Sequence, residues 1–153
     1  MKKGLVDTID MVIVGYFTGM GRRADLGLGA FLGAIYNKEE ETFDVVCKVG
    51  TGLTDEILKS LSKKLRKERI KEQYKDIRVD SLLIPDVWVK PSIVVTVEAD
   101  EITRNLNRSK DSLGAGLSLR FPRLVYIRED KGVEDITTVR ELVEMFDIQK
   151  TSE

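Results

Sequence analysis

Apolar side chains in the first fifty residues follow the pattern of buried β-strands. Three segments rich in β-branched, aromatic or alternating apolar positions are predicted strands: residues 9–17, 30–36 and 43–50. The glycine-studded segment Gly15–Gly29 between the first two predicts a turn or bulge. It lacks the Gly-Lys-Ser/Thr ending of a phosphate-binding loop. In the third strand, a period of two places Val45, Cys47 and Val49 on one side.

The apolar spacing becomes helical after Gly52. Thr54 is the predicted N-cap, because its hydroxyl can accept a backbone N–H, and Asp55 and Glu56 follow in the first turn. The apolar stripe consists of Ile57, Leu58, Leu61, Leu65 and Ile70. This stripe predicts one amphipathic helix of roughly five turns that extends to about Tyr74.

Prolines and arginines interrupt the strand pattern in the second half of the chain. Pro85 and Pro91 bracket "DVWVK", which predicts an extended edge segment because proline has no N–H for a central strand. Ser92–Ile102 has the clearest strand pattern of the sequence. A strand-like stretch, "GLSLRFPRLVYIRED", follows at Gly116–Asp130, with Pro122 in its middle and several arginines.

A final helical pattern completes the order of elements. Val139, Leu142, Val143 and Phe146 share one helical face, with Thr137 or Thr138 as the predicted cap. The order β–β–β–α–β–β–α predicts a mainly β protein with an OB-fold. We expect a Greek-key barrel of five to six strands, with one amphipathic helix after the third strand and a C-terminal helix. Residues 1–153 are expected to form a single domain, since no linker or repeat divides them.

The amino-acid composition excludes several classes of protein and of catalytic site. The 153 residues are 42% apolar and 33% charged with a net charge of −1, which fits a soluble globular protein without a membrane span or secretion signal. A single cysteine, Cys47, excludes an internal disulfide, and the absence of histidine argues against a zinc site and excludes histidine-dependent catalysis. Residues 59–78 contain nine Lys or Arg against three Asp or Glu, so this segment is basic. The excess permits a basic binding face, but a solvated helix face explains this segment better when it is taken alone.

Several sequence blocks together resemble a known family. "DTIDMVIVGYFTGMGRR", "GAFLGAIYN", "VCKVGTGLTDE", "PDVWVKPS" and "GLSLRFPRLVYIREDKGVEDITTV" occur in this order. They are similar to the C-terminal OB-fold domain of ATP-dependent DNA ligases, most closely the replicative type of archaea and eukaryotic nuclei. The resemblance covers residues 7–146, is loosest in residues 59–81, and places the family's motif VI at Ser118–Lys131.

The resemblance implies nick sealing in DNA replication, repair and recombination. In this family a lysine attacks ATP, AMP passes to the 5′-phosphate of a nick, and the 3′-hydroxyl then displaces AMP. That lysine belongs to a KxDG motif in a separate nucleotidyltransferase domain, and this sequence contains no Lys-x-Asp-Gly. The chain is therefore expected to be inactive by itself, with no catalytic residue and no metal site of its own. ATP and Mg²⁺ are expected in the full-length enzyme, with neither bound by this domain alone.

The resemblance also implies partners. They are nicked double-stranded DNA, the nucleotidyltransferase domain in cis or in trans, and a sliding clamp engaged through regions outside this chain. No membrane is expected. The protein is expected to be intracellular, in the cytoplasm and nucleoid if archaeal and in the nucleus if eukaryotic.

One set of residues is expected to contact DNA. From the residues alone, Arg120, Phe121 and Arg123 are either exposed arginines around a core phenylalanine or two phosphate-binding guanidinium groups around an apolar wedge. The resemblance implies the second interpretation, on the minor-groove side beside the nick and without sequence specificity. Arg22 and Arg23 match backbone-contacting positions of the family, and Lys48 is a weaker candidate.

A second set is expected to act on the nucleotide. Arg128 and Lys131 match the basic positions of the family's terminal RxDK, which orients the β,γ-phosphates and stabilises the pyrophosphate leaving group during lysine adenylation. Asp130 is expected to hold Arg128 or Lys131 in place rather than to act on substrate; the alternative is a strand-end salt bridge of little energetic value. Relatives often have another arginine where this chain has Tyr126.

Other functions fit parts of the sequence. A stand-alone OB-fold could bind single-stranded nucleic acid by aromatic stacking, but few aromatic residues fall on polar strand faces. The OB domain of an RNA ligase or mRNA capping nucleotidyltransferase shares the terminal RxDK, whereas "SLRFPR" and "PDVW" favour the DNA enzymes. A purely structural role is the remaining alternative.

Overall fold

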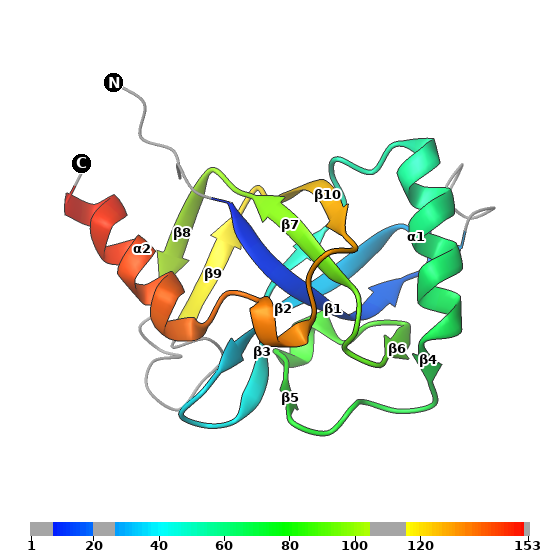
Figure 1. Cartoon of the computed structure of the whole chain (residues 1–153), viewed down its shortest axis with the longest axis horizontal. Helices are drawn as coiled ribbons and strands as arrows, with labels where there is room; N and C mark the ends of the chain where they lie inside the picture. The colour runs from blue at the N-terminus through cyan, green and yellow to red at the C-terminus, as the bar shows by residue number, and fades with distance from the viewer. Residues whose placement is uncertain (1–7, 20–26, 105–115, 152–153) are drawn as a thin grey trace.

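A curled β-sheet forms the centre of the molecule in the computed structural model, which describes residues 8–19, 27–104 and 116–151. Its principal strands are β1 (Ile9–Phe17), β2 (Ala30–Asn37), β3 (Thr42–Val49), β7 (Val94–Glu98) and β10 (Arg123–Arg128). They hydrogen-bond in the order β10-β7-β1-β2-β3. The short strand β5 (Ile77–Arg78) lies beside β3 and pairs with it in parallel. Two helices lie at opposite ends of the sheet (Figure 1). The predicted mainly β OB-fold with two helices is confirmed.

The curl of the sheet depends on β1, which pairs with different strands along its length. Ile9–Val12 pair with β7, whereas Gly15 and Tyr16 pair with β6 (Val87–Val89). A side chain at Gly15 would place its Cβ 2.7 Å from the ring of Pro85, so only glycine allows β6 to approach. The sequence predicted that "DVWVK" would be an extended edge segment. This prediction is wrong, because β6 lies between β1 and β4 (Arg69–Ile70).

Both faces of the sheet are covered by apolar side chains. Alternate residues of β1 point to opposite faces, so Ile9, Met11 and Ile13 enter the larger cluster beneath the two helices. Val12 and Val14 enter a second cluster with residues of the 70–94 segment and Ile136. The predicted grouping of Val45 with Cys47 and Val49 is wrong. A bulge opposite Gly33 and Ala34 shifts the register, so Val45 joins the second cluster and the other two join the first. Burial raises the pKa of the Cys47 thiol to about 12, so this strand residue remains a neutral thiol at physiological pH.

The helix after β3 begins as predicted but ends earlier. In α1 (Asp55–Lys67), the Thr54 side chain accepts the Ile57 N–H, and Leu58, Leu61 and Leu65 are buried. The sequence pattern predicted an end near Tyr74. Instead, residues 69–70 form β4 against β6, because strand pairing satisfies their backbone and competes successfully with another helical turn.

The clear strand pattern of Ser92–Ile102 is divided between two sheets. After β7 the chain turns, and β8 (Glu101–Arg104) pairs with β9 (Leu117–Arg120) in a separate two-stranded ribbon. The ribbon packs against α2 (Val139–Thr151), where the Gln149 amide exchanges two hydrogen bonds with the Ile102 backbone. Thr138 caps α2, and its N–H and hydroxyl contact the Glu141 carboxylate, which confirms the second of the two predicted caps.

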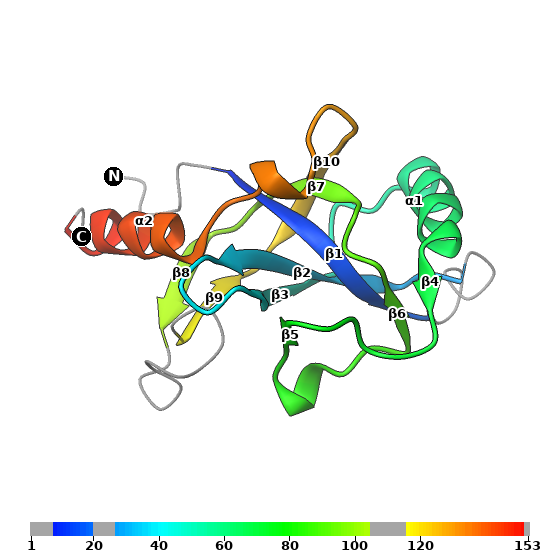
Figure 2. The ribbon, with the colours of Figure 1, turned by 60° about the horizontal axis from the view of Figure 1, so that its bottom comes forward.

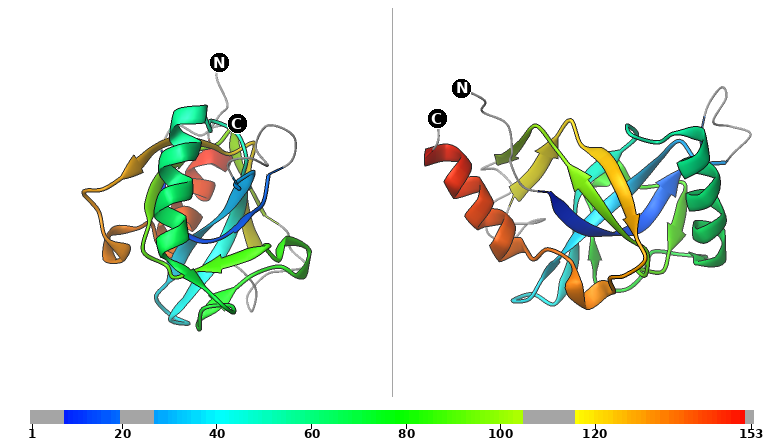
Figure 3. Two further views of the ribbon diagram at one scale, coloured as in Figure 1. Left: turned by 90° about the vertical axis from the view of Figure 1, so that its right-hand side faces the viewer. Right: turned by 45° about the horizontal axis from the view of Figure 1, so that its top comes forward.

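Two short elements lie in other connections of the described residues. A 3₁₀ turn, η2 (Ser81–Leu83), lies between β5 and β6, and another, η5 (Val133–Asp135), precedes α2. Figure 2 shows the β5–η2 segment on the side of the sheet away from the loop that follows β10. That loop stands out from the body of the molecule (Figure 3). Within the described ranges, no helix is long and apolar enough to cross a membrane.

Candidate nucleic-acid and nucleotide interface

The strand-like stretch from Gly116 to Asp130 is broken at Phe121 and Pro122 into two strands that belong to different sheets. Phe121 has a positive φ of 55°, which turns the chain between β9 and β10. Its ring is 62% exposed, so Phe121 is not a core residue. Pro122 lies in the gap where pairing is interrupted, as expected for a residue without an N–H. The two flanking arginines are consequently brought to the outside of the same turn.

Each of these arginines is paired with carboxylates. The guanidinium of Arg120 lies 3.0 Å from Glu101 and 5.0 Å from the centroid of the Phe121 ring. Arg123 donates to Asp100 at 3.0 Å and to Glu98 at 2.9 Å, and these hydrogen bonds raise the pKa of its guanidinium. Sequence reasoning missed the acidic partners, because they come from β7, β8 and the turn between them. A phosphate at this turn would therefore exchange with carboxylates that already bind the arginines.

The opposite end of β10 carries the second cationic group. Arg128 forms a bidentate pair with Asp130, with distances of 2.9 Å from Nε to Oδ1 and 2.8 Å from Nη2 to Oδ2. Its guanidinium also lies 5.5 Å from the centroid of the Tyr126 ring, which is half-exposed. The hydrogen bonds with Arg128 hold the pKa of Asp130 at about 2, and those with Asp130 raise the pKa of Arg128. The expected contact of Asp130 with one of the two cations is therefore present.

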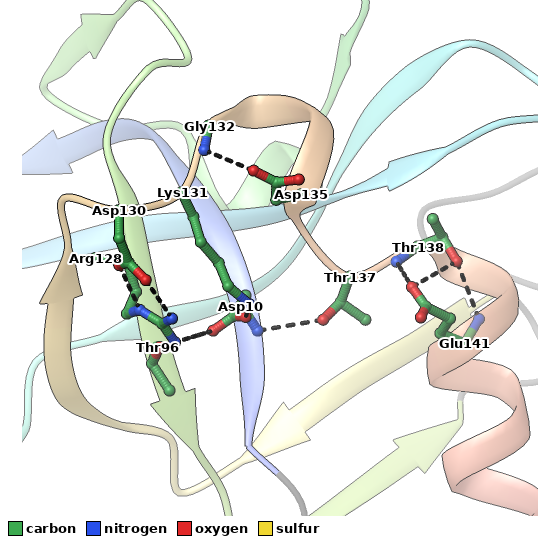
Figure 4. A network of polar contacts seen from close by, with 10 residues as sticks. All are labelled: Asp10, Thr96, Arg128, Asp130, Lys131, Gly132, Asp135, Thr137, Thr138 and Glu141. Atoms are coloured by element: carbon green, nitrogen blue, oxygen red, sulfur yellow. Dashed lines mark hydrogen bonds and ion pairs between the residues drawn. The ribbon is translucent and has the colours of Figure 1, made fainter.

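Lys131 is held by a residue that sequence reasoning did not identify. Its ammonium lies 2.5 Å from Oδ2 of Asp10, near the start of β1 (Figure 4). Burial opposes ionisation of Asp10, but hydrogen bonds from Lys131 and Thr96 outweigh it, so the pKa of this carboxyl lies below its ordinary value. The only sequence signal was an acidic residue in an otherwise apolar strand. Nearby, Lys64 of α1 pairs with Glu129 at 2.7 Å.

The Arg128–Asp130 pair predicts an acid titration that can be measured directly. We expect the Asp130 carboxyl to titrate at about pH 2, and to return toward its ordinary pKa of 3.8 in Arg128→Met. Because the folded-state pKa is lowered, the pair contributes to stability above the ordinary pKa, and this contribution is lost as pH falls from about 4 to about 2. Side-chain carbon NMR across this range measures the pKa. An unchanged Asp130 pKa in the variant would contradict the pairing.

The remaining predicted DNA contacts have different outcomes. Lys48 is exposed on β3, and its ammonium lies 4.0 Å from the centroid of the Phe17 ring. Arg22 and Arg23 lie outside the described residues. Among the described residues, no group of three or more carboxylate, thiol or imidazole side chains could hold a metal ion.

The position of β10 is fixed by the connection between β3 and α1. The Leu124 N–H donates to the Thr51 carbonyl at 3.0 Å. Gly52 has a positive φ of 85°, and a Cβ there would lie 2.5 Å from the Leu124 carbonyl oxygen. The strand that separates the two cationic groups is therefore anchored near its start. Since β10 has six residues, a span of roughly 17 Å separates the groups.

Comparison with known proteins identifies relatives of this chain. Residues 24–131 match the family described as the ATP dependent DNA ligase C terminal region. A probable DNA ligase of Dictyoglomus turgidum is 48% identical over 151 residues, covering 95% of this chain and 25% of the relative. A DNA ligase of Sulfurisphaera tokodaii is 46% identical over 146 residues, covering 93% of this chain and 24% of the relative.

Solved DNA ligase structures have a similar fold. The ligase domain of LigD from M. tuberculosis superposes with a TM-score of 0.65 at 25% identity, covering 86% of this chain and 38% of that chain. Mycobacterial DNA ligase D complexed with ATP and MES gives a TM-score of 0.63 at 25% identity, covering 86% and 37%. This chain thus spans about a quarter of the length of the curated relatives. By sequence and by fold, the chain belongs to the family of ATP-dependent DNA ligase C-terminal regions.

Proposed function

We propose that residues 1–153 form a single OB-fold domain that works with a ligase nucleotidyltransferase domain, in cis or in trans, during ATP-dependent sealing of nicked DNA. The domain binds duplex DNA with one end of β10. With the other end, it assists transfer of AMP from ATP to a lysine of the partner domain. The observation that carries the proposal is the placement of two cationic groups at opposite ends of one anchored strand, within a domain of this family.

The DNA-binding end consists of Arg120, Phe121 and Arg123. Guanidinium groups bind phosphate through paired N–H donors, and an exposed phenylalanine can press against base edges in the minor groove. Such contacts carry no sequence information, which suits an enzyme that seals any nick. Because carboxylates already pair with both arginines, phosphate binding exchanges one anion for another. We therefore expect modest affinity, which should fall as salt rises because each neutralised phosphate releases counterions. Lys48, Arg22 and Arg23 would add further backbone contacts.

The nucleotide end consists of Arg128, Asp130 and Lys131, the terminal residues of the proposed motif VI at Ser118–Lys131. The planar guanidinium and the ammonium match the β- and γ-phosphate oxygens of ATP and the pyrophosphate that leaves during adenylation. Asp130 orients the guanidinium through its bidentate pair. The partner domain supplies the lysine nucleophile, and ATP with Mg²⁺ binds there. The projection of the loop after β10 suits a group that reaches into another domain (Figure 3).

Binding to defined DNA substrates tests the DNA-binding end. We expect fluorescence anisotropy to show that the chain prefers nicked or intact duplex over single-stranded DNA. The double variant Arg120→Gln, Arg123→Gln should weaken duplex binding about tenfold or more. It should also reduce the slope of log affinity against log salt by about 0.9 for each phosphate that is no longer neutralised. Arg140→Gln, on the exposed surface of α2, is a control for the loss of one positive charge and should change neither quantity.

Two results would contradict this proposal. Preference for single-stranded DNA would favour the stand-alone single-strand-binding alternative. An equal loss of binding free energy per removed charge in the Arg140→Gln control would indicate binding through overall charge alone. A nicked RNA duplex that competes equally with nicked DNA would favour an RNA-joining or capping enzyme.

A further inference from the structure

We propose that Asp10 is a positioning residue that fixes Lys131, beside Arg128, in the geometry with which it receives phosphate. The inference rests on the proposed function of the nucleotide end of β10. It adds a residue that lies more than a hundred positions earlier in the sequence and outside the segment Ser118–Lys131. The arrangement is drawn in Figure 4.

The place of Asp10 on β1 is unusual for a charged residue. Val12 and Val14, the next residues on the same face of β1, belong to a buried apolar cluster. Asp10 continues this face at its polar end, where its side chain is only 16% exposed. A carboxylate this far removed from water must be compensated by donors. Its cross-strand partner on β7 is Thr96, a buried residue whose hydroxyl donates to Asp10 Oδ1 at 2.7 Å.

The remaining donors come from the proposed motif VI. The Lys131 ammonium is hydrogen-bonded to Oδ2 of Asp10, and the Arg128 guanidinium lies 3.8 Å from Oδ1. Arg128 is also 3.4 Å from the Thr96 hydroxyl. Asp10 and Thr96 thus form one acceptor unit across β1 and β7, and the two cations from β10 and the following loop converge on it.

The backbone of Asp10 holds the same loop at a second point. The Thr137 N–H donates to the Asp10 carbonyl at 2.9 Å, and the Asp10 N–H donates to the Thr137 hydroxyl at 3.2 Å. The segment from Lys131 to Thr137 is therefore attached at both ends to a single residue of β1. Ile136, within this segment, is buried in the second apolar cluster. The loop cannot move Lys131 far without breaking its hydrogen bonds with Asp10.

The charge balance of this cluster makes orientation decisive. Two cations, Arg128 and Lys131, face two carboxylates, Asp10 and Asp130, so the four groups carry no net charge. Attraction of a triphosphate therefore depends on where the N–H donors point rather than on the sum of charges. A lysine side chain has a flexible four-carbon stem and loses its fixed direction when its anchor is removed. A displacement of about 1 Å in a positioned group can lower a rate about 100-fold.

A double-mutant cycle in an active enzyme tests the inference. The C-terminal quarter of the Dictyoglomus turgidum ligase would be replaced by this whole chain, and transfer of labelled AMP to the enzyme lysine would be measured in single turnovers. We expect Lys131→Met to slow adenylation about 100-fold and Asp10→Asn about tenfold. In the Lys131→Met background, Asp10→Asn should have no more than a small further effect on the rate, because its action passes largely through Lys131.

Two further variants separate positioning from general damage. Thr96→Val removes the hydroxyl that orients Asp10 while keeping the shape of a buried β-strand residue, and it should reproduce part of the Asp10→Asn effect. Asp147→Asn makes the same charge change on the exposed surface of α2 and should leave adenylation unchanged. Sealing of a nick that already carries AMP should be nearly normal in Asp10→Asn, because that step follows release of pyrophosphate. A protein that was merely unstable would lose both steps.

The outcomes of this test are distinguishable. If Lys131→Met adenylates normally, the proposed function of the nucleotide end fails. If Lys131→Met is slow but Asp10→Asn is normal, or if the two effects multiply independently in the double variant, the proposed function survives and the positioning role of Asp10 is wrong.

Discussion

Replacing Arg128 with alanine is expected to lower the rate of lysine adenylation by about 100- to 1,000-fold when this chain works with a nucleotidyltransferase domain. The guanidinium is held in one plane by the bidentate pair with Asp130 and by the nearby Tyr126 ring. It can therefore meet charge that develops on the departing pyrophosphate without first reorganising. Alanine removes the guanidinium and leaves the carboxylate of Asp130 beside an anionic leaving group. Both changes act in the same direction.

The measurement is single-turnover formation of the enzyme–AMP adduct, with two reference variants. Arg128→Lys keeps the charge but loses the planar fork, so its rate should fall between those of the wild type and Arg128→Ala. Arg140→Ala, at an exposed arginine of α2, should adenylate normally. Equal rates for Arg128→Lys and wild type would show that charge alone suffices. A normal rate for Arg128→Ala would remove this residue from the adenylation step.

Elements with a simple periodic pattern were predicted well from the sequence. The first three strands, the Thr54 cap and the face of the C-terminal helix all follow from local spacing of apolar residues and from capping chemistry. In these segments, the residues that decide the structure are close together in the sequence. The break at Phe121 and Pro122 was also visible, because proline cannot take part in a strand ladder.

Features that depend on distant segments were not predictable in this way. The helix α1 ends where residues 69–70 pair with β6, and β6 lies about twenty positions later in the sequence. The apolar stripe through Ile70 therefore predicted too long a helix. The division of Ser92–Ile102 between two sheets depends on where β9 lies. The candidate site shows the same limit. The cations were found from their motif, but Asp10 joins Lys131 only through the pairing of β1 with β7, which periodicity does not specify.

Another polar interaction between distant residues is expected to be costly to break. Asp44 on β3 is fully buried and accepts hydrogen bonds from several donors. Arg78 of β5 donates at 2.9 and 2.8 Å, Thr42 at 2.7 Å and Asn37 at 3.1 Å. The pair with Arg78 attaches the 70–94 segment to the sheet, beside the parallel register of Phe43 with Ile77. This segment covers the second apolar cluster, so losing the pair should expose more than the ion pair itself.

Asp44→Ala is expected to lower the free energy of unfolding by about 3–5 kcal/mol, because it leaves the Arg78 cation without its buried carboxylate. Urea unfolding at neutral pH measures this loss, and Asp147→Ala, on the exposed face of α2, should change stability by less than about 0.5 kcal/mol. Hydrogen exchange of the Phe43 amide, which donates to Asp76 at 2.7 Å, should quicken as β5 detaches. The double variant Asp44→Ala, Arg78→Met should be more stable than Asp44→Ala alone, since no unpaired charge remains. If the double variant is less stable than the single one, the cost comes from poorer packing and missing hydrogen bonds rather than from the isolated cation.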